Sequence, residues 1–519
     1  MERSRLLFKS VCRYKCWSVV SLTFIVVFTL IIGFRYFEFN IAIKLVCRAQ
    51  QAWPETVVPR KKIQRSKSDF GYDWLRIQKA RIDWRAMLKP CSDQLAWGTL
   101  KSGWGRVNKT SASRSYVTYM NIRNSGQFSS IFIHTRTASG QDKTIGGDNW
   151  RVFFTGPANV AASVFDYENG TYETTALLLE PGNYTVRAYL DYSLCDGLRD
   201  PPENWFRIGN KQGKQQPEGI LGFLNDFIYE PLSGGKIITF EVSSNETRGV
   251  KNGLPSLTCA QSCRSLWNGF GRWKNNAWLP YLPVSHLPTL EKPPPPRGTL
   301  WIFGDSLGVR FHFSLSTKPL CRRIFEQCRH SYNWLYPFPG ENEVLAKSKY
   351  NNLDFQPTII LDSIRDVLRD TSMKTRYSLL VLNLGLHYPV SLNFTTYQKL
   401  IDDVIQILNV RKNELGSNAR VIWKTTTSLR KEKTKPPRNA TQWRFFTEPR
   451  VRLFDTYAMW AMCRAGIEVL DVFPLTASYP NGTQDIVHYS NNVFNAAEIA
   501  LENYVKAGPA FRSTRVCMK

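Results

Sequence analysis

The chain has 519 residues, which at roughly 100–200 residues per domain allows two to four domains. Hydrophobic residues make up 43% of it and aromatic residues 13%, enough to bury large cores, so a disordered or low-complexity protein is excluded. Lys and Arg outnumber Asp and Glu by 68 to 42, and the formal charge of +26 predicts an acidic partner: nucleic acid, anionic lipid or acidic glycan.

The N-terminus contains a membrane signal. Residues 17–34 (WSVVSLTFIVVFTLIIGF) carry no charge and are long enough for a transmembrane helix, with a buried core helix as the alternative. Residues 1–16 are basic with one acid, so the positive-inside rule places them in the cytosol. The sequence therefore predicts a single-pass type II protein of the Golgi or plasma membrane, attached through this one helix, with its remainder lumenal or extracellular.

N-glycosylation motifs follow the apolar run and none precedes it. The N-x-S/T sequons begin at Asn108, Asn169, Asn183, Asn245, Asn393, Asn439 and Asn481. This distribution agrees with a secretory topology and predicts glycans at these positions. Because lumenal proteins seldom meet nucleic acid, we expect no nucleic-acid partner, and the positive charge instead predicts an acidic or sialylated glycan acceptor.

Eight cysteines lie beyond residue 90, and paired together they would form four disulfides. They are Cys91, Cys195, Cys259, Cys263, Cys321, Cys328, Cys463 and Cys517. The two close pairs, Cys259/Cys263 and Cys321/Cys328, lack a second matched pair and nearby His ligands, so we expect no metal.

The chain divides into segments of different character. Residues 35–90 are basic, with one amphipathic helix near residues 73–89, and predict a solvated stem; a patch that holds an acidic glycan or lipid headgroup is the alternative. The predicted layout is a cytosolic tail (1–16), a transmembrane signal anchor (17–34), the stem (35–90), a β-sandwich (91–250), a Cys- and Pro-containing linker (251–297) and an α/β domain (298–519).

Short alternating strands and turns fill residues 91–250. QFSSIFIHTRT alternates apolar and polar residues, and Asn169-Gly170 lies between two β-rich runs, which is a strong hairpin signal. Strands at this spacing predict an antiparallel β-sandwich.

Strands alternate with helices after Gly298. TLWIF, PTIILD, YSLLVLNLG, ARVIWKTTT and GIEVLDVF are expected strands, while TYQKLIDDVIQILNVRK and NVFNAAEIALENYVK have helical periodicity. This alternation predicts a three-layer α/β fold with a parallel sheet, whose active site lies at the carboxyl ends of the strands.

A candidate nucleophile opens the α/β domain. Gly304-Asp305-Ser306 follows TLWIF and precedes a predicted helix, so Ser306 lies where free helix amides can stabilise an oxyanion. The alternative makes Asp305 a helix cap and Ser306 a bystander.

A candidate base lies near the C-terminus. Among the six histidines, only His488 follows an acid, Asp485, at a spacing that one turn can join, as a nucleophilic serine requires. His387, with Asn383 and Gly385, ends a predicted strand and is a candidate for the oxyanion or substrate wall, as is Gly304 beside the nucleophile.

These motifs resemble a known family. GGDNWRVFFTGP and VFDYENGTYETTALLLEPGNYTVRAYL are similar to the immunoglobulin/filamin-type domain of the NXPE (neurexophilin and PC-esterase domain) family. GDS, NLGLH, VIWKTTTS and the terminal DxxH resemble the PC-esterase branch of the GDSL/SGNH hydrolases. The resemblance implies Ser306 as nucleophile, His488 as base and Asp485 as its orienting acid, in an enzyme that moves acetyl groups to or from sugars.

Three functions remain open at this stage: a glycan O-acetyltransferase, a glycan acyl esterase, and an inactive cell-surface binding protein. No bound cofactor is expected. The transferase needs an acetyl donor as co-substrate, with acetyl-coenzyme A as one candidate. A single helix forms no conduit, so a multi-pass partner that delivers the acetyl group is the other option.

Overall fold

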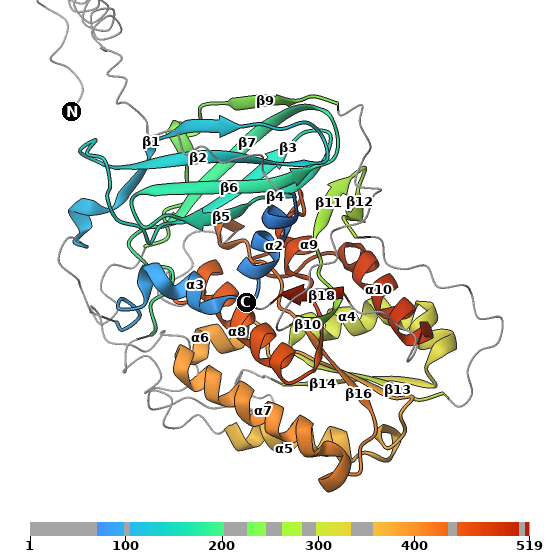
Figure 1. Cartoon of the computed structure of the whole chain (residues 1–519). Coiled ribbons are helices and arrows are strands. Elements are labelled where there is room, and N and C mark those ends of the chain that lie inside the picture. The colour runs from blue at the N-terminus through green and yellow to red at the C-terminus, as the bar shows by residue number, and fades with distance from the viewer. Residues whose placement is uncertain are drawn as a thin grey trace, which may run out of the picture. The chain divides into compact units, whose positions relative to one another are not determined.

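The computed structural model describes residues 70–97, 104–201, 226–244, 262–282, 297–333, 357–433, 444–507 and 514–517. All of them belong to one compact unit, Ser68–Lys519. Within it, a β-sandwich and an α/β sheet covered by helices are distinguishable (Figure 1).

The sandwich consists of two sheets whose strands pair antiparallel. One sheet has the order β1-β2-β6-β5, and the other has the order β12-β11-β4-β3-β7-β8, with β9 also paired to β7. The strands are β1 (Thr110–Asn121), β2 (Gln127–Thr137), β3 (Asn149–Thr155), β4 (Asn159–Ala161), β5 (Ser163–Asp166), β6 (Thr171–Leu178), β7 (Gly182–Tyr192), β8 (Glu230–Pro231), β9 (Ile238–Val242), β11 (Gly271–Lys274) and β12 (Ala277–Pro280).

Alternation along the strands fills the sandwich core. Trp150, Val152 and Phe154 of β3 are buried two residues apart and pack against Ile131 and Ile133 of β2. Successive side chains of a strand point to opposite faces, so this period-2 pattern gives each sheet one inner face.

The α/β sheet has the order β14-β13-β15-β16-β17-β10-β18. All its pairs are parallel except β10 with β18. Its strands are β10 (Ser262–Trp267), β13 (Thr299–Gly304), β14 (Gln327–Tyr332), β15 (Leu379–Leu382), β16 (Arg420–Lys424), β17 (Glu468–Leu470) and β18 (Thr514–Cys517). The chain leaves β13 for β14 on one side and later returns to β15 on the other, which makes the carboxyl end of β13 a topological switch point, where α/β proteins bind ligands.

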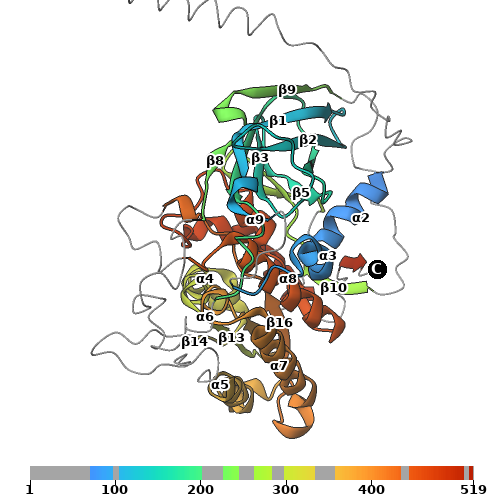
Figure 2. The same ribbon diagram turned by 90° about the vertical axis from the view of Figure 1, so that its left-hand side faces the viewer.

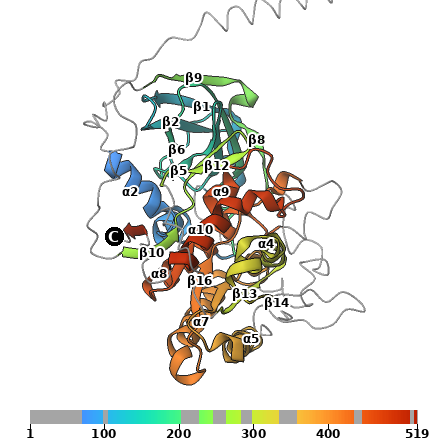
Figure 3. The same cartoon turned by 90° about the vertical axis from the view of Figure 1, so that its right-hand side faces the viewer.

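Helices cover both faces of this sheet. In β15, Leu379 and Val381 pack with α4 and α10, while Leu380 and Leu382 pack with α5, α7 and α8. Figure 3 shows α4 and α10 on one side of β13 and β16, and α5 and α7 on the other. The helices of the described chain are α2 (Phe70–Ala80), α3 (Trp84–Leu88), α4 (Ser306–Ser316), α5 (Pro357–Arg369), α6 (His387–Ser391), α7 (Phe394–Glu414), α8 (Glu448–Arg464), α9 (Phe473–Ala477) and α10 (Asn495–Ala507).

Part of the predicted stem packs against the sandwich. Helix α2 lies beside the sandwich (Figure 2). Its Trp74 and Ile77 are buried in a cluster with Phe128 of β2 and Tyr281. Arg81, directly after α2, forms buried ion pairs with carboxylates of the α/β domain. The apolar stripe noted in the sequence is therefore a packing face, and residues 70–91 are not a solvated spacer.

The predicted linker also contributes to both sheets. Strand β10 joins the α/β sheet beside β17, whereas β11 and β12 extend a sheet of the sandwich. The proline run at residues 293–296 lies outside the described residues.

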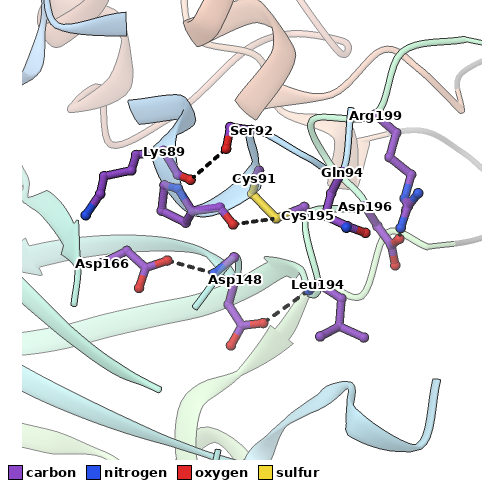
Figure 4. Close-up of a disulfide and its surroundings, with 12 residues drawn as sticks. Lys89, Cys91, Ser92, Gln94, Asp148, Asp166, Leu194, Cys195, Asp196 and Arg199 are labelled. Atoms are coloured by element: carbon purple, nitrogen blue, oxygen red, sulfur yellow. Dashed lines mark hydrogen bonds and ion pairs between the residues drawn. A yellow bond between two sulfur atoms is a disulfide. The ribbon is translucent and has the colours of Figure 1, made fainter. Parts of the chain in front are cut away.

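Three disulfides are present among the described residues. Cys91–Cys195 joins the segment after α3 to the chain just beyond β7, with Asp148 and Asp166 nearby (Figure 4). The others are Cys263–Cys463, between β10 and α8, and Cys321–Cys328, which joins the short helical turn Leu320–Ile324 to β14.

The predicted fold class and localisation need correction. They depended on a transmembrane helix at residues 17–34, which lie outside the described residues. Among the helices that are described, none combines the length and the apolar character needed to cross a bilayer. On this finding, the predicted fold class with a membrane helix is wrong, and so is the predicted single-pass type II localisation at the Golgi or plasma membrane. The described residues form the sandwich, the α/β sheet and the helices that pack beside them.

The buried ammonium group of Lys424 should make the free energy of unfolding depend on pH. The side chain of Lys424, at the end of β16, is 2% exposed, and its ammonium lies 5.4 Å from the centre of the Phe311 ring. Burial lowers the pKa of Lys424 to about 8, although Asp305 and Asp455 act in the opposite direction. The folded protein therefore bears a cost for holding this charge that the unfolded chain does not bear.

Lys424→Met is expected to raise the free energy of unfolding at pH 7 by about 1–4 kcal/mol, because an apolar side chain replaces a buried charge. The gain should shrink between pH 8 and pH 10.5, since the folded wild type then loses its proton before the unfolded chain does. Denaturant unfolding at pH 7 and pH 10 measures the gain in the free energy of unfolding and its decrease with pH. Lys318→Met, at a half-exposed lysine, is the control. If Lys424→Met differed from the wild type by the same free energy of unfolding at both pH values, the expectation would be contradicted.

Candidate active site

Ser306 lies at the junction of β13 and α4. Strand β13 ends at Gly304, and Asp305 caps the helix that Ser306 begins, with its Oδ1 accepting a hydrogen bond from the Leu307 N–H at 2.9 Å. A Cβ on Gly304 would lie 3.2 Å from the Cα of Gly308, so glycine allows strand and helix to approach closely. The helix N-terminus and the sheet's switch point thus coincide at this serine.

His488 and Asp485 lie in the loop between α9 and α10. The Asp485 Oδ1 accepts hydrogen bonds from the Val487 and His488 N–H groups, each at 2.8 Å, which fixes the carboxylate in a local turn. The Oδ2 lies 2.7 Å from the Nδ1 of His488. The Nε2 of the same ring lies 3.1 Å from the Oγ of Ser306.

These contacts define the proton positions that the network favours. Nδ1–H donates to the Asp485 carboxylate, which leaves Nε2 as the acceptor for the Ser306 hydroxyl. This is the order of groups that an activated serine nucleophile requires. The structure therefore brings Ser306 together with His488, 182 residues later in the sequence, and with its neighbour Asp485.

The acid–base pair is accessible to solvent. The Asp485 side chain is 53% exposed and that of His488 is 22% exposed. Partial burial acts to raise the pKa of Asp485, but the hydrogen bonds from the His488 side chain and from the backbone outweigh it and lower that pKa. The carboxylate is consequently charged at neutral pH, as an orienting acid must be.

Asp305 has a second role that the sequence did not indicate. Its side chain is buried, and its Oδ2 accepts a hydrogen bond from the Leu386 N–H at 3.0 Å. A Cβ on Gly385 would lie 2.6 Å from this Oδ2, so glycine is required for the approach. One carboxylate thus joins the start of α4 to the loop after β15. Its place in the GDS tripeptide predicted only the local cap, because the second bond spans 81 residues.

Asn383 does not fit the predicted oxyanion role. Its Nδ2 donates to the Lys424 carbonyl at 2.8 Å and to the Thr426 Oγ1 at 3.3 Å, so the amide links the ends of β15 and β16. Both N–H groups of the amide are used in this way.

His387 lies within electrostatic range of Asp305 and His488. It begins α6, burial lowers its pKa, and Asp305 and His488 are the charged groups that act on it. A neutral imidazole beside the pair suits the predicted substrate wall, and this role stays a prediction, as do the weaker ones of Gly304 and Gly385.

An apolar cluster holds the site on its inner side. Leu307 follows the nucleophile and Ile486 lies between Asp485 and His488, and both are buried together. The cluster is completed by Leu386, Val390, Leu429, Phe446 and Val451. Its packing fixes the start of α4 against the loop that carries the base.

The structure describes five of the predicted glycosylation positions. Asn169, Asn183 and Asn481 are exposed, while Asn108 and Asn393 are half-buried. Asn393 caps α7 by accepting a hydrogen bond from the Thr396 N–H. Asn245 and Asn439 lie outside the described residues. Glycosylation at all seven stays a prediction.

No cluster of His, Cys, Asp or Glu suited to a metal ion occurs among the described residues. Independently of this, a serine, a histidine and a carboxylate in this order are the groups that nucleophilic catalysis uses, with the serine as the attacking group.

Comparisons with known proteins do not assign a family. No protein-family model matches the chain, and no curated protein matches it. The filamin domain of Lin-41 is similar over 15% of this chain and 80% of its own, at 18% identity and a TM-score of 0.14. A protein assigned as a glycoside hydrolase from Bacteroides vulgatus ATCC 8482 is similar over 65% of this chain and 54% of its own, at 11% identity and a TM-score of 0.16. These likenesses are too weak to carry an argument about fold or function.

Proposed function

We propose that this protein transfers an acyl group, most simply acetyl, to a glycan hydroxyl through a covalent intermediate on Ser306. The observation that carries the proposal is the pair of distances at His488, 3.1 Å from Nε2 to the Ser306 Oγ and 2.7 Å from Nδ1 to Asp485. Nucleophile, base and orienting acid are within hydrogen-bond reach without any ligand.

The first half of the reaction acylates the serine. As the Oγ of Ser306 attacks the carbonyl carbon of the acyl donor, the hydroxyl proton passes to Nε2 of His488. The bond from that carbon to the donor's leaving group breaks, and the leaving group takes the proton from Nε2. Asp485 holds the imidazole in its orientation and stabilises the transient imidazolium.

The second half transfers the acyl group. The acceptor hydroxyl gives its proton to Nε2 while its oxygen attacks the acyl carbon, and Ser306 leaves and regains a proton. Because Ser306 begins α4, the positive end of the helix dipole lies at the nucleophile and would stabilise the oxyanion that develops there, while the Leu307 N–H is already used by the Asp305 cap.

The acceptor and donor follow from charge and resemblance. An excess of Lys and Arg suits an acidic or sialylated glycan or an anionic donor such as acetyl-coenzyme A, and the sequence motifs resemble the NXPE family, whose PC-esterase branch acts on sugar O-acetyl groups. A partner that supplies the acetyl group remains part of the proposal.

A glycan acyl esterase is the second candidate. The exposure of Asp485 and His488 favours it, since water reaches the base directly. It uses the same residues with water in place of the sugar hydroxyl.

Product analysis separates the candidates. The purified protein, kept free of reductant to preserve its disulfides, is incubated with p-nitrophenyl acetate or acetyl-coenzyme A, with and without a sialylated oligosaccharide. Acetylated sugar would support the transferase, and acetate released at an unchanged rate would support the esterase. If neither acetylated sugar nor acetate formed, and a fluorophosphonate did not label Ser306, catalysis would be contradicted. A binding function would then be the remaining candidate.

Asp305→Asn is expected to lower kcat on the activated ester roughly 10- to 100-fold with little change in KM, because asparagine can accept only one of the two backbone hydrogen bonds. The start of α4 would then be uncoupled from the loop at Leu386. Steady-state kinetics measure the effect, and Asp370→Asn, which removes a carboxylate that caps residues Thr371–Met373 away from the site, serves as control. An unchanged kcat in the Asp305 variant would contradict the role.

A further inference from the structure

A short segment lies between the sandwich and the loop that carries the catalytic base. Residues 428–433 follow β16, and we refer to residues 478–490, which contain Asp485 and His488, as the base loop. Hydrogen bonds join the segment to the base loop on one side, and ion pairs join it to the sandwich on the other.

The contacts to the base loop surround Asp485. The Arg430 N–H donates to the Ile486 carbonyl at 2.8 Å. The Lys433 Nζ donates to the carbonyls of Asn481, at 3.1 Å, and Thr483. The backbone on both sides of the catalytic acid is therefore held by this one segment.

A further bond holds the loop just beyond the base. The Tyr489 Oη donates to the Ser428 carbonyl at 2.7 Å, and the tyrosine ring is buried. Since Tyr489 is the neighbour of His488, the imidazole is fixed from the segment as well as from Asp485.

The contact to the sandwich is a double carboxylate fork. Arg151 of β3 donates from Nη1 and Nη2 to the two carboxylate oxygens of Glu432, at 3.0 and 3.1 Å. The same guanidinium donates from Nη2 to Asp191 of β7 at 3.0 Å, with its Nε also 3.0 Å from that carboxylate. The side chains of Arg151, Asp191 and Glu432 are 11%, 2% and 16% exposed, so water screens these pairs little.

Two more contacts link the segment to the sandwich. The Arg430 guanidinium lies 4.8 Å from the centre of the Phe153 ring, and Nη2 donates to the Ala477 carbonyl, directly before the base loop, at 3.0 Å. The Lys431 Nζ donates to the Tyr192 Oη at 3.0 Å. Three consecutive side chains of the segment thus contact the sandwich.

We propose that Arg151 and Glu432 are positioning residues for the catalytic base, and that the sandwich orients the base loop through them. This inference rests on the proposed function, since it concerns the rate of the same reaction. Only arginine presents the planar fork that binds two carboxylates at once, so lysine at position 151 keeps the charge and loses the geometry.

Arg151→Lys and Glu432→Gln are each expected to lower kcat on an activated ester roughly 10- to 100-fold, with KM within about twofold of the wild type. The double variant should be no slower than the slower single variant, because both changes remove the same coupling. Arg272→Lys is the control for loss of a buried arginine–carboxylate pair elsewhere: the Arg272 Nε donates to both carboxylate oxygens of Glu180, at 2.9 and 3.0 Å, within the sandwich.

Hydrogen exchange of the full protein provides a readout that needs no turnover. We expect amides of residues 478–490 to exchange faster in Arg151→Lys and Glu432→Gln but not in Arg272→Lys, and amides of α7 to stay as in the wild type. The inference would be overturned if the base-loop amides of both variants exchanged at the wild-type rate, or if faster exchange extended equally to α7. Faster exchange confined to the base loop, in a protein whose wild type turns over no ester, would show that the sandwich orients this loop through Arg151 and Glu432 and would contradict the proposed function.

Discussion

Replacing Ser306 with alanine is expected to abolish acyl transfer, with kcat/KM on an activated ester lowered by about 10⁴-fold or more. The variant lacks the oxygen that forms the covalent bond, and its His488 has no hydroxyl to deprotonate. Removal of one hydroxyl at a half-buried helix start should change the free energy of unfolding by less than about 1 kcal/mol. Steady-state kinetics and thermal unfolding measure the two effects.

The same helix offers a matched control. Ser316 ends α4, and its Oγ donates to the Phe313 carbonyl within the same helix. Ser316→Ala should therefore keep wild-type turnover and fluorophosphonate labelling, whereas Ser306→Ala should lose both. Retained turnover in a folded Ser306→Ala protein would reduce the GDS tripeptide to a turn and a cap.

His488→Ala should be nearly as severe as Ser306→Ala, because the hydroxyl is a weak nucleophile without a base. Asp485→Asn should have a similar or smaller effect, since the orienting acid contributes through the histidine. The losses should not multiply: the double variant Ser306→Ala/His488→Ala should resemble either single variant.

His312→Ala is the control for loss of an imidazole. His312 lies on α4, and its Nε2 is 3.3 Å from the Cys328 carbonyl rather than near the nucleophile. Its variant should keep most activity. Losses that multiply fully in the Ser306/His488 double variant would mean that the two groups act in separate steps.

Local patterns in the sequence predicted several elements well. Strand β13 and the helix at Ser306 follow from an apolar β-prone run, a glycine and a cap, which are all short-range signals. The hairpin at Asn169-Gly170 lies between β5 and β6, as the dipeptide indicates. His488 was selected because an acid three residues earlier can reach it within one turn, and the structure has that bond.

Other elements depended on information that short windows lack. PTIILD was predicted as a strand, but it begins helix α5, whose buried Ile360, Leu361, Ile364, Val367 and Leu368 show helical spacing only over the longer stretch. Asn383 was a candidate for the oxyanion or substrate wall by its place after a strand, yet its amide donates to the end of β16, 41 residues later. Arg151 and Glu432 are 281 residues apart, and nothing local to either predicts their contact.

Strand β10 determines which fragments of the chain can be stable alone. It comes before the first strand of the predicted α/β domain, yet it lies between β17 and β18 in the sheet. A fragment that begins at residue 298 would leave β17 with an open edge and β18 without its partner, and open edges promote aggregation. During synthesis, β10 emerges about 200 residues before β17. The sheet can therefore be completed only after β17 and β18 have been synthesised, so a chain that terminates before them would leave β10 unpaired and an exposed sheet edge.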